Sequence, residues 1–167
     1  SEQEKLAARL TKLTGMKAVF FSNSGCEANE AAIKFARLFA NSKKVTDPQI
    51  IVMENSFHGR TMATLSATGS RKVQAGFEPL LKGFIRVPFD DLNSLKKIAD
   101  QNKNIVAILV EPIQGEGGVR LPKNLSSYLN DLRKICDLNE WLLMLDEVQT
   151  GVGRTGRLYA YQYSDIK

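Results

Sequence analysis

Sulfur and imidazole side chains are scarce in this chain of 167 residues. It has two cysteines, Cys26 and Cys136, and a single histidine, His58. Two cysteines so far apart form no disulfide scaffold and are typical of a protein from a reducing compartment. Because zinc sites take most of their ligands from closely spaced cysteines and histidines, we expect no metal centre.

Long apolar runs and concentrated charge are also missing. No apolar run approaches the roughly 20 residues of a membrane-spanning helix, so we expect no membrane partner. The net charge of +5 comes from scattered basic residues, without an arginine-rich arm or an alternation of basic and aromatic residues. This pattern argues against a nucleic-acid partner. The modest positive charge is also compatible with a small anionic substrate.

The two ends of the sequence are typical of cuts within a larger domain. The first residues are not those of a secretory signal peptide and lead directly into a helical pattern. The last residues, 165–167, follow no closing helix or strand. We therefore expect one domain over residues 1–167, truncated at both ends, from a longer protein of the cytoplasm (or of the mitochondrial matrix in a eukaryote).

Amphipathic segments alternate with short apolar runs along the chain. The helical patterns cover about 2–14, 27–41, 92–102 and 125–139, and the runs typical of strands cover 18–21, 50–53, 84–87, 105–110 and 142–145. On the second helix we expect one apolar face, made by Ala28, Ala31, Ala32, Phe35 and Phe39. The alternation predicts an α/β fold with a mainly parallel sheet, covered by helices on both faces.

The most informative segment is 145–150, which places an acid, Asp146, directly after an apolar strand. Open α/β sheets bind their ligands at this carboxyl edge. A carboxylate buried there is costly unless a cation or a strong hydrogen-bond donor meets it. The protonated ring nitrogen of pyridoxal phosphate (PLP) is one fitting partner. The simpler alternative is a helix cap or a salt bridge after the strand.

Two further segments offer groups that bind anions and flat rings. Residues 22–30 join a strand to a helix, and the small residues Ser24 and Gly25 leave backbone N–H groups there free for a phosphate. The alternative is that Ser24 is a plain helix cap. Residues 55–61 provide Phe57 and His58, which can stack on a planar ring, and Arg60, whose guanidinium suits a carboxylate. The alternative for these three is a core Phe, a surface His and a solvated Arg.

A third segment, 111–118, places two acids in a glycine-rich loop after a wholly apolar strand. Glu111 and Glu116 could neutralise an arginine there or change the protonation of a cofactor. The alternative is that both carboxylates are simply solvated.

In order and spacing, these four segments together resemble the class III (subgroup II) aminotransferases, which are PLP enzymes of fold type I. The resemblance covers essentially the whole chain, and segments 57–69, 76–80 and 87–92 are similar to the branch that acts on acetylornithine. It implies that residues 1–167 are part of the large, PLP-binding domain of such an enzyme.

The resemblance implies contacts with the cofactor phosphate and with both ring faces. Gly25 and Cys26, next to Ser24, would donate backbone N–H groups to the phosphate. The family often has threonine at the Cys26 position, and backbone donation is insensitive to that change. Phe57 would stack on one face of the ring, and Val148 would press on the other.

The resemblance also implies roles for the charged and amide side chains. Asp146 would keep the ring nitrogen protonated, and Gln149 would lie near the phenolic oxygen of the ring. Arg60 would hold the substrate α-carboxylate. Glu116 would pair with a distant active-site arginine, and Glu111 would lie near the cofactor.

The whole protein implied by the resemblance is a homodimeric transaminase with amino-acid and 2-oxo-acid substrates. It would convert N2-acetylornithine and 2-oxoglutarate to N-acetylglutamate 5-semialdehyde and glutamate in arginine biosynthesis. Ornithine, succinyldiaminopimelate, succinylornithine and 4-aminobutyrate are the alternative donors. No lysine here has the sequence context of the family's Schiff-base lysine, so we expect that residue outside the chain. The alternative from another class is a non-catalytic α/β module that binds phosphate or a nucleotide.

Overall fold

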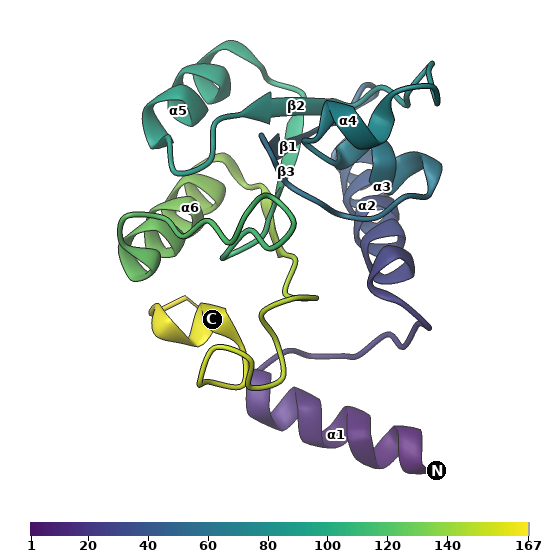
Figure 1. The fold of residues 1–167 in the computed structure, drawn as a ribbon, viewed down its shortest axis with the longest axis vertical. Helices are drawn as coiled ribbons and strands as arrows, with labels where there is room; N and C mark the ends of the chain where they lie inside the picture. Colours follow the sequence, from purple (N-terminus) through teal and green to yellow (C-terminus); the bar gives the residue numbers. More distant parts are fainter. Residues whose placement is uncertain (167) are drawn as a thin grey trace.

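A four-stranded, fully parallel sheet forms the centre of the computed structural model, which describes residues 1–166. The strands lie in the order β2-β1-β3-β4 and comprise β1 (Gln49–Met53), β2 (Phe84–Val87), β3 (Ile105–Val110) and β4 (Leu142–Leu145); the first three are labelled in Figure 1. Because all the pairings are parallel, the four carboxyl ends meet at one edge of the sheet. The predicted fold class, a parallel sheet between helices, is confirmed.

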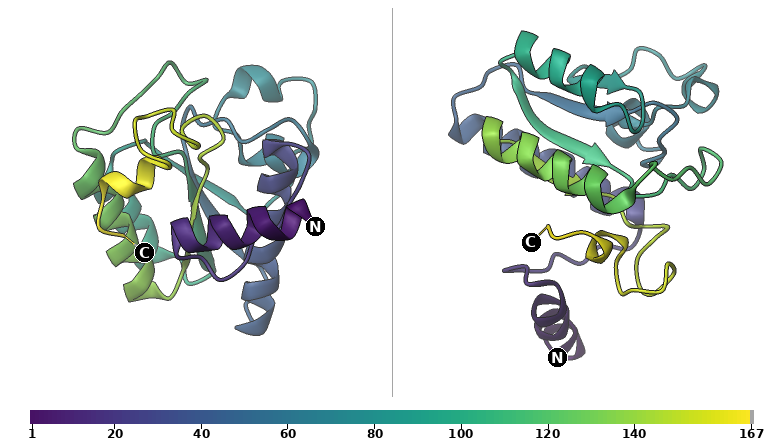
Figure 2. Two further views of the ribbon diagram at one scale, coloured as in Figure 1. Left: turned by 90° about the horizontal axis from the view of Figure 1, so that it is seen from below. Right: turned by 90° about the vertical axis from the view of Figure 1, so that its left-hand side faces the viewer.

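Helices cover both faces of this sheet. Helix α2 (Gly25–Ser42) packs on one face, whereas α5 (Leu92–Gln101) and α6 (Leu125–Asn139) pack on the other (Figure 1). Helix α1 (Glu2–Thr14) lies apart from the sheet, beside the C-terminal segment (Figure 2). Three short helices complete the description: α3 (Met62–Ala67), α4 (Arg71–Gln74) and the 3-10 turn η1 (Ala160–Tyr163).

The side chains of β1 alternate between the two layers. Ile50 and Val52 pack with α2, and Ile51 and Met53 pack with α5 and α6. All six residues of β3 are buried, as a strand covered on both sides requires. The continuous apolar runs of the sequence are therefore explained by burial on two faces.

One sequence-based expectation about an element is wrong, and another is wrong in part. Residues 18–21 are not a strand, and the ring of Phe20 is 66% exposed. A strand needs a neighbouring strand for the hydrogen bonds of its N–H and C=O groups. In the described structure the edge strand β4 pairs with β3 alone, so residues 18–21 do not extend the sheet. On α2, Phe39 packs against the sheet as expected, together with Ile33, Ala36 and Ala40, whereas Phe35 is 56% exposed.

None of the helices in residues 1–166 combines the length and the hydropathy that crossing a bilayer requires.

Candidate functional site

A cavity of about 310 Å³ lies where the loops after β1, β3 and β4 meet the first turn of α2. Nine of the eleven site residues singled out in the sequence line it, together with Asn29 and Gly59. The lining comprises Gly25, Cys26, Asn29, Phe57, His58, Gly59, Arg60, Glu111, Asp146, Val148 and Gln149. The parallel sheet brings these residues together because each strand delivers its following loop to the same edge.

Asp146 is buried at the base of this cavity, and donors surround its carboxylate. Its Oδ2 lies 2.8 Å from Nδ1 of His58 and accepts from Nδ2 of Asn29 at 2.8 Å. Its Oδ1 accepts from the N–H of Val148 at 3.1 Å. Burial alone would raise the pKa of Asp146, but the hydrogen bond and the charge of His58, with the Val148 and Asn29 donors, lower it. Asp146 is therefore held as a carboxylate.

Asn29 is a site residue to which the sequence reasoning gave no role. Its Nδ2 donates both to Oδ2 of Asp146 and to the carbonyl of His58, the latter at 2.9 Å. It lies four residues after Gly25, so both residues are on the same face of α2. That spacing from the helix start is the signal that could have identified it.

His58 was expected to offer a flat face to a planar ring, and the structure gives it a different set of contacts. Its side chain is fully buried, and Nδ1 faces Asp146. Its Nε2 is buried without a hydrogen-bond partner among the described residues. His58 thus contributes to the cavity chiefly by orienting Asp146.

The first turn of α2 presents free backbone donors to the cavity. Ser24 caps the helix by accepting from the N–H of Glu27 at 3.2 Å. Within residues 1–166, the N–H groups of Gly25 and Cys26 have no protein acceptor. A Cβ atom on Gly25 would lie 2.5 Å from Cγ2 of Val148, so only glycine admits Val148 here. Free N–H groups at a helix N-terminus form an anion site.

Arg60 is exposed at the mouth of the cavity, where its guanidinium lies 5.9 Å from the centre of the Phe57 ring. Glu30 of α2 secures the next turn, because its Oε1 accepts from the hydroxyl of Thr61 and from the N–H of Thr64, the latter at 3.2 Å. The guanidinium makes no salt bridge in the described chain, and therefore remains available to a ligand carboxylate.

Glu111 follows β3 and is buried. Its Oε1 accepts from the N–H of Phe57 at 3.4 Å. Burial, together with the charge of Asp146, raises its pKa to about 8. The structure places Ser24 and Glu116 outside the cavity lining: Ser24 is the exposed cap of α2, and Glu116 is exposed on its loop.

These features fit PLP. The free N–H groups of α2 suit its phosphate, and Phe57 and Val148 provide walls for a flat ring. Asp146 suits a protonated ring nitrogen, because Oδ1 has a single hydrogen-bond donor in the described structure and can accept another. Of the five buried side-chain atoms that lack a partner in the described structure, two, Nε2 of His58 and Oε2 of Glu111, belong to residues of this cavity.

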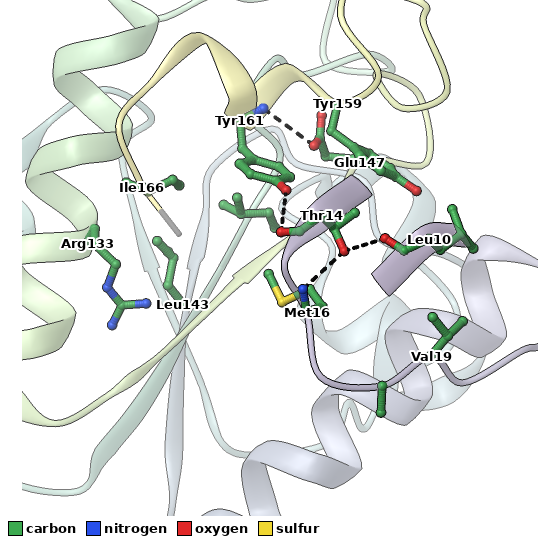
Figure 3. A pocket seen from close by; sticks show the side chains of 12 residues that line it. Leu10, Thr14, Met16, Val19, Arg133, Leu143, Glu147, Tyr159, Tyr161 and Ile166 are labelled. Atoms are coloured by element: carbon green, nitrogen blue, oxygen red, sulfur yellow. Dashed lines mark hydrogen bonds between the residues drawn. The ribbon is translucent and has the colours of Figure 1, made fainter. Parts of the chain in front are cut away.

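A second hollow, of about 360 Å³, lies on the α6 side of β4, between the chain after α1 and the C-terminal segment (Figure 3). Its lining is mainly apolar, and several of its polar groups are paired within the chain, whereas Nε of Arg133 is buried without a hydrogen-bond partner among the described residues. Glu147 accepts from the N–H groups of Ala160 and Tyr161, and the hydroxyl of Tyr161 donates to the carbonyl of Thr14 at 3.2 Å.

Comparisons with known proteins agree with this geometry. The acetylornithine aminotransferase of Nitrosomonas europaea is 63% identical over 98% of the chain, and acetylornithine aminotransferase 1 of Bordetella parapertussis is 49% identical over 99%. The solved ornithine aminotransferase of Toxoplasma gondii superimposes with a TM-score of 0.91 at 34% identity, over 98% of the chain.

The chain spans 41% and 42% of the two acetylornithine aminotransferases and 38% of the solved structure. The family model "Aminotransferase class-III" matches residues 1–167. The chain therefore belongs to the class-III aminotransferase family.

Proposed function

We propose that residues 1–167 form part of the large, PLP-binding domain of an acetylornithine aminotransferase. The observation that carries this proposal is the buried Asp146 carboxylate, which has an accepting oxygen in a cavity with a free helix N-terminus. Relatives named acetylornithine aminotransferase match almost the whole chain, which supports this donor over the others.

PLP, when bound, supplies an electron sink for the transfer of an amino group. The carboxylate of Asp146 holds a proton on the ring nitrogen, which keeps that sink effective. His58 and Asn29 hold the other oxygen of Asp146 and thereby fix its direction. Gly25 and Cys26 bind the phosphate through their N–H groups, and Phe57 and Val148 keep water from the two ring faces.

Arg60 binds the α-carboxylate that both the amino-acid and the 2-oxo-acid substrates carry. Gln149 would lie near the phenolic oxygen of bound PLP, and Gly115 leaves room for its side chain, because a Cβ there would lie 3.0 Å from Cγ of Gln149. We place the lysine that anchors PLP, and an arginine partner for Glu116, in the remainder of the longer protein. The active protein is then a homodimer, in the cytoplasm or in the mitochondrial matrix of a eukaryote.

The test is a donor panel with the purified full-length protein. Acetylornithine, ornithine, succinyldiaminopimelate, succinylornithine and 4-aminobutyrate are each paired with 2-oxoglutarate, and kcat/KM is measured. We expect the largest kcat/KM with acetylornithine. A larger value with any other donor would reassign the substrate and leave the family intact.

The non-catalytic alternative is tested by absorbance. A PLP-bound protein shows a visible band that borohydride fixes covalently, whereas a nucleotide-binding module shows none. The absence of that band in the full-length protein incubated with PLP would contradict the proposed function.

A further inference from the structure

Glu111 has one carboxyl oxygen that the protein leaves without a partner. The residue is 5% exposed and lines the cavity, directly after β3. Its Oε1 accepts from the N–H of Phe57, whereas Oε2 is buried with no hydrogen-bond partner among the described residues. An ionised oxygen buried without a donor is unfavourable, so the environment of Oε2 favours the protonated form.

The charged groups around Glu111 strengthen this preference. Asp146 already places one negative charge in the cavity, and His58 is committed to that carboxylate. Arg60 is exposed over the ring of Phe57, and the thiol of Cys26 contacts Thr61 and Thr64. Glu116, on the same loop, adds a second unfavourable charge. No cation among residues 1–166 forms a salt bridge with Glu111.

We propose that Glu111 is a neutral carboxylic acid at neutral pH and that its O–H donates a hydrogen bond, through Oε2, to an acceptor atom of the cofactor. This inference rests on the proposed function, because PLP is the occupant that supplies the acceptor. Two carboxyl groups of one cavity then take opposite roles: Asp146 accepts as a carboxylate, and Glu111 donates as an acid.

The protonation state is tested on the full-length protein without cofactor, by measuring the free energy of unfolding against pH. The pKa of Glu111 rises from 4.5 to about 8 on folding, so its stabilising effect is complete below pH 4.5 and is lost as pH rises towards 8. Glu111→Gln cannot ionise. We therefore expect the variant to gain stability relative to the wild type across this interval.

The matched control is Glu54→Gln, which removes an exposed charge directly after β1 that is not among the groups acting on Glu111. A constant difference between wild type and Glu111→Gln from pH 4.5 to 8 would show that Glu111 ionises normally in the folded protein. That result would overturn the proposal, whatever the cofactor does.

The donor role is tested by titrating the same proteins with PLP and following its absorbance. At pH 7, Glu111→Gln keeps a donor and should bind PLP as the wild type does. Glu111→Leu has no donor and should bind roughly twofold to tenfold more weakly. Above pH 8 the wild type should weaken, and Glu111→Gln should not.

Equal PLP affinity of Glu111→Leu and Glu111→Gln would overturn the donor role. If the wild type itself failed to bind PLP, the proposed function and the donor role would both fall. The unfolding profiles would still decide the protonation state of Glu111, so the two failures are distinguishable.

Discussion

Asp146 is the residue on which the site depends, because three donors fix the charge and direction of its carboxylate and a backbone hydrogen bond holds the residue at the end of β4. His58 and Asn29 occupy Oδ2, Val148 contacts Oδ1, and the N–H of Asp146 itself donates to the carbonyl of Val110 at 2.8 Å. A carboxylate held in this way is already oriented before a ligand binds, and such preorganisation is how active sites stabilise charge.

Asn29 should contribute to stability as well as to orientation. Asn29→Ala leaves two buried acceptors, Oδ2 of Asp146 and the carbonyl of His58, each with one donor fewer. We expect the free energy of unfolding of the full-length protein to fall by about 1–3 kcal/mol, measured by urea denaturation. Asn93→Ala, at an exposed position of α5, is the control and should change little. Equal losses in the two variants would contradict this role for Asn29.

Arg60→Lys tests the carboxylate site. A lysine keeps the charge and loses the two-pronged hydrogen-bonding geometry, so KM should rise for the amino donor and for 2-oxoglutarate alike. PLP affinity should barely change, because Arg60 lies at the mouth of the cavity. Steady-state kinetics with both substrates provide the measurement. A loss confined to PLP affinity would assign Arg60 to the cofactor site instead.

At the scale of elements, the short helix α3 depends on a distant residue. The residue at the N-cap position, Thr61, makes no side-chain capping bond, and Glu30 of α2 accepts from the N–H of Thr64 instead. An acid at a helix N-terminus also interacts favourably with the helix dipole. The turn that follows Arg60 is therefore secured by the same helix that presents the phosphate donors.

Glu30→Gln should loosen α3. The loss of a capping carboxylate is worth about 1 kcal/mol, which corresponds to roughly fivefold faster amide hydrogen exchange in residues 62–67. Glu54→Gln, an exposed carboxylate after β1, is the control. Unchanged exchange in residues 62–67 of the Glu30 variant would show that the cap contributes nothing.

The sequence predicted the elements whose signal is local. The runs 84–87, 105–110 and 142–145 have the same bounds in the structure, because burial on two faces demands uninterrupted apolar residues. Helix α3 was not predicted, since Glu30, its capping residue, lies 31 residues from Thr61. The apolar residues 18–21 have strand composition, yet composition cannot supply a pairing neighbour.

The features of the site also divide into those that a local sequence pattern predicts and those that it does not. The ends of β3 and β4 placed Glu111 and Asp146 at the cavity, as their positions after apolar strands indicated. The contact between His58 and Asp146 joins residues that are 88 positions apart in the sequence. The unpartnered oxygen of Glu111 likewise results from tertiary packing, so no local sequence pattern predicts either feature.

At the scale of the whole molecule, the 167-residue chain exposes apolar side chains that a folded protein normally covers. Phe20, Phe35 and Leu38 are each more than half exposed. Expressed alone, the chain should associate, because large exposed apolar side chains favour assembly or aggregation. It should also produce no glutamate from acetylornithine and 2-oxoglutarate above the background of free PLP, since no lysine in residues 1–166 lines the cavity.

Light scattering after gel filtration and a glutamate assay provide the two measurements, with the full-length protein as control. A monodisperse, monomeric chain would contradict the first expectation. Glutamate formation above background would contradict the second, and would mean that a lysine of this chain can act as the anchor.

The central claim, that Asp146 holds a proton on the ring nitrogen of PLP, is tested most directly by nitrogen-15 NMR. The full-length protein and its Asp146→Asn variant are each loaded with PLP labelled at the ring nitrogen. The wild type should show a protonated nitrogen at pH 7, and the variant an unprotonated one, with turnover reduced about tenfold to a hundredfold. An unprotonated nitrogen in the wild type, or the same protonated signal and turnover in both proteins, would contradict the account.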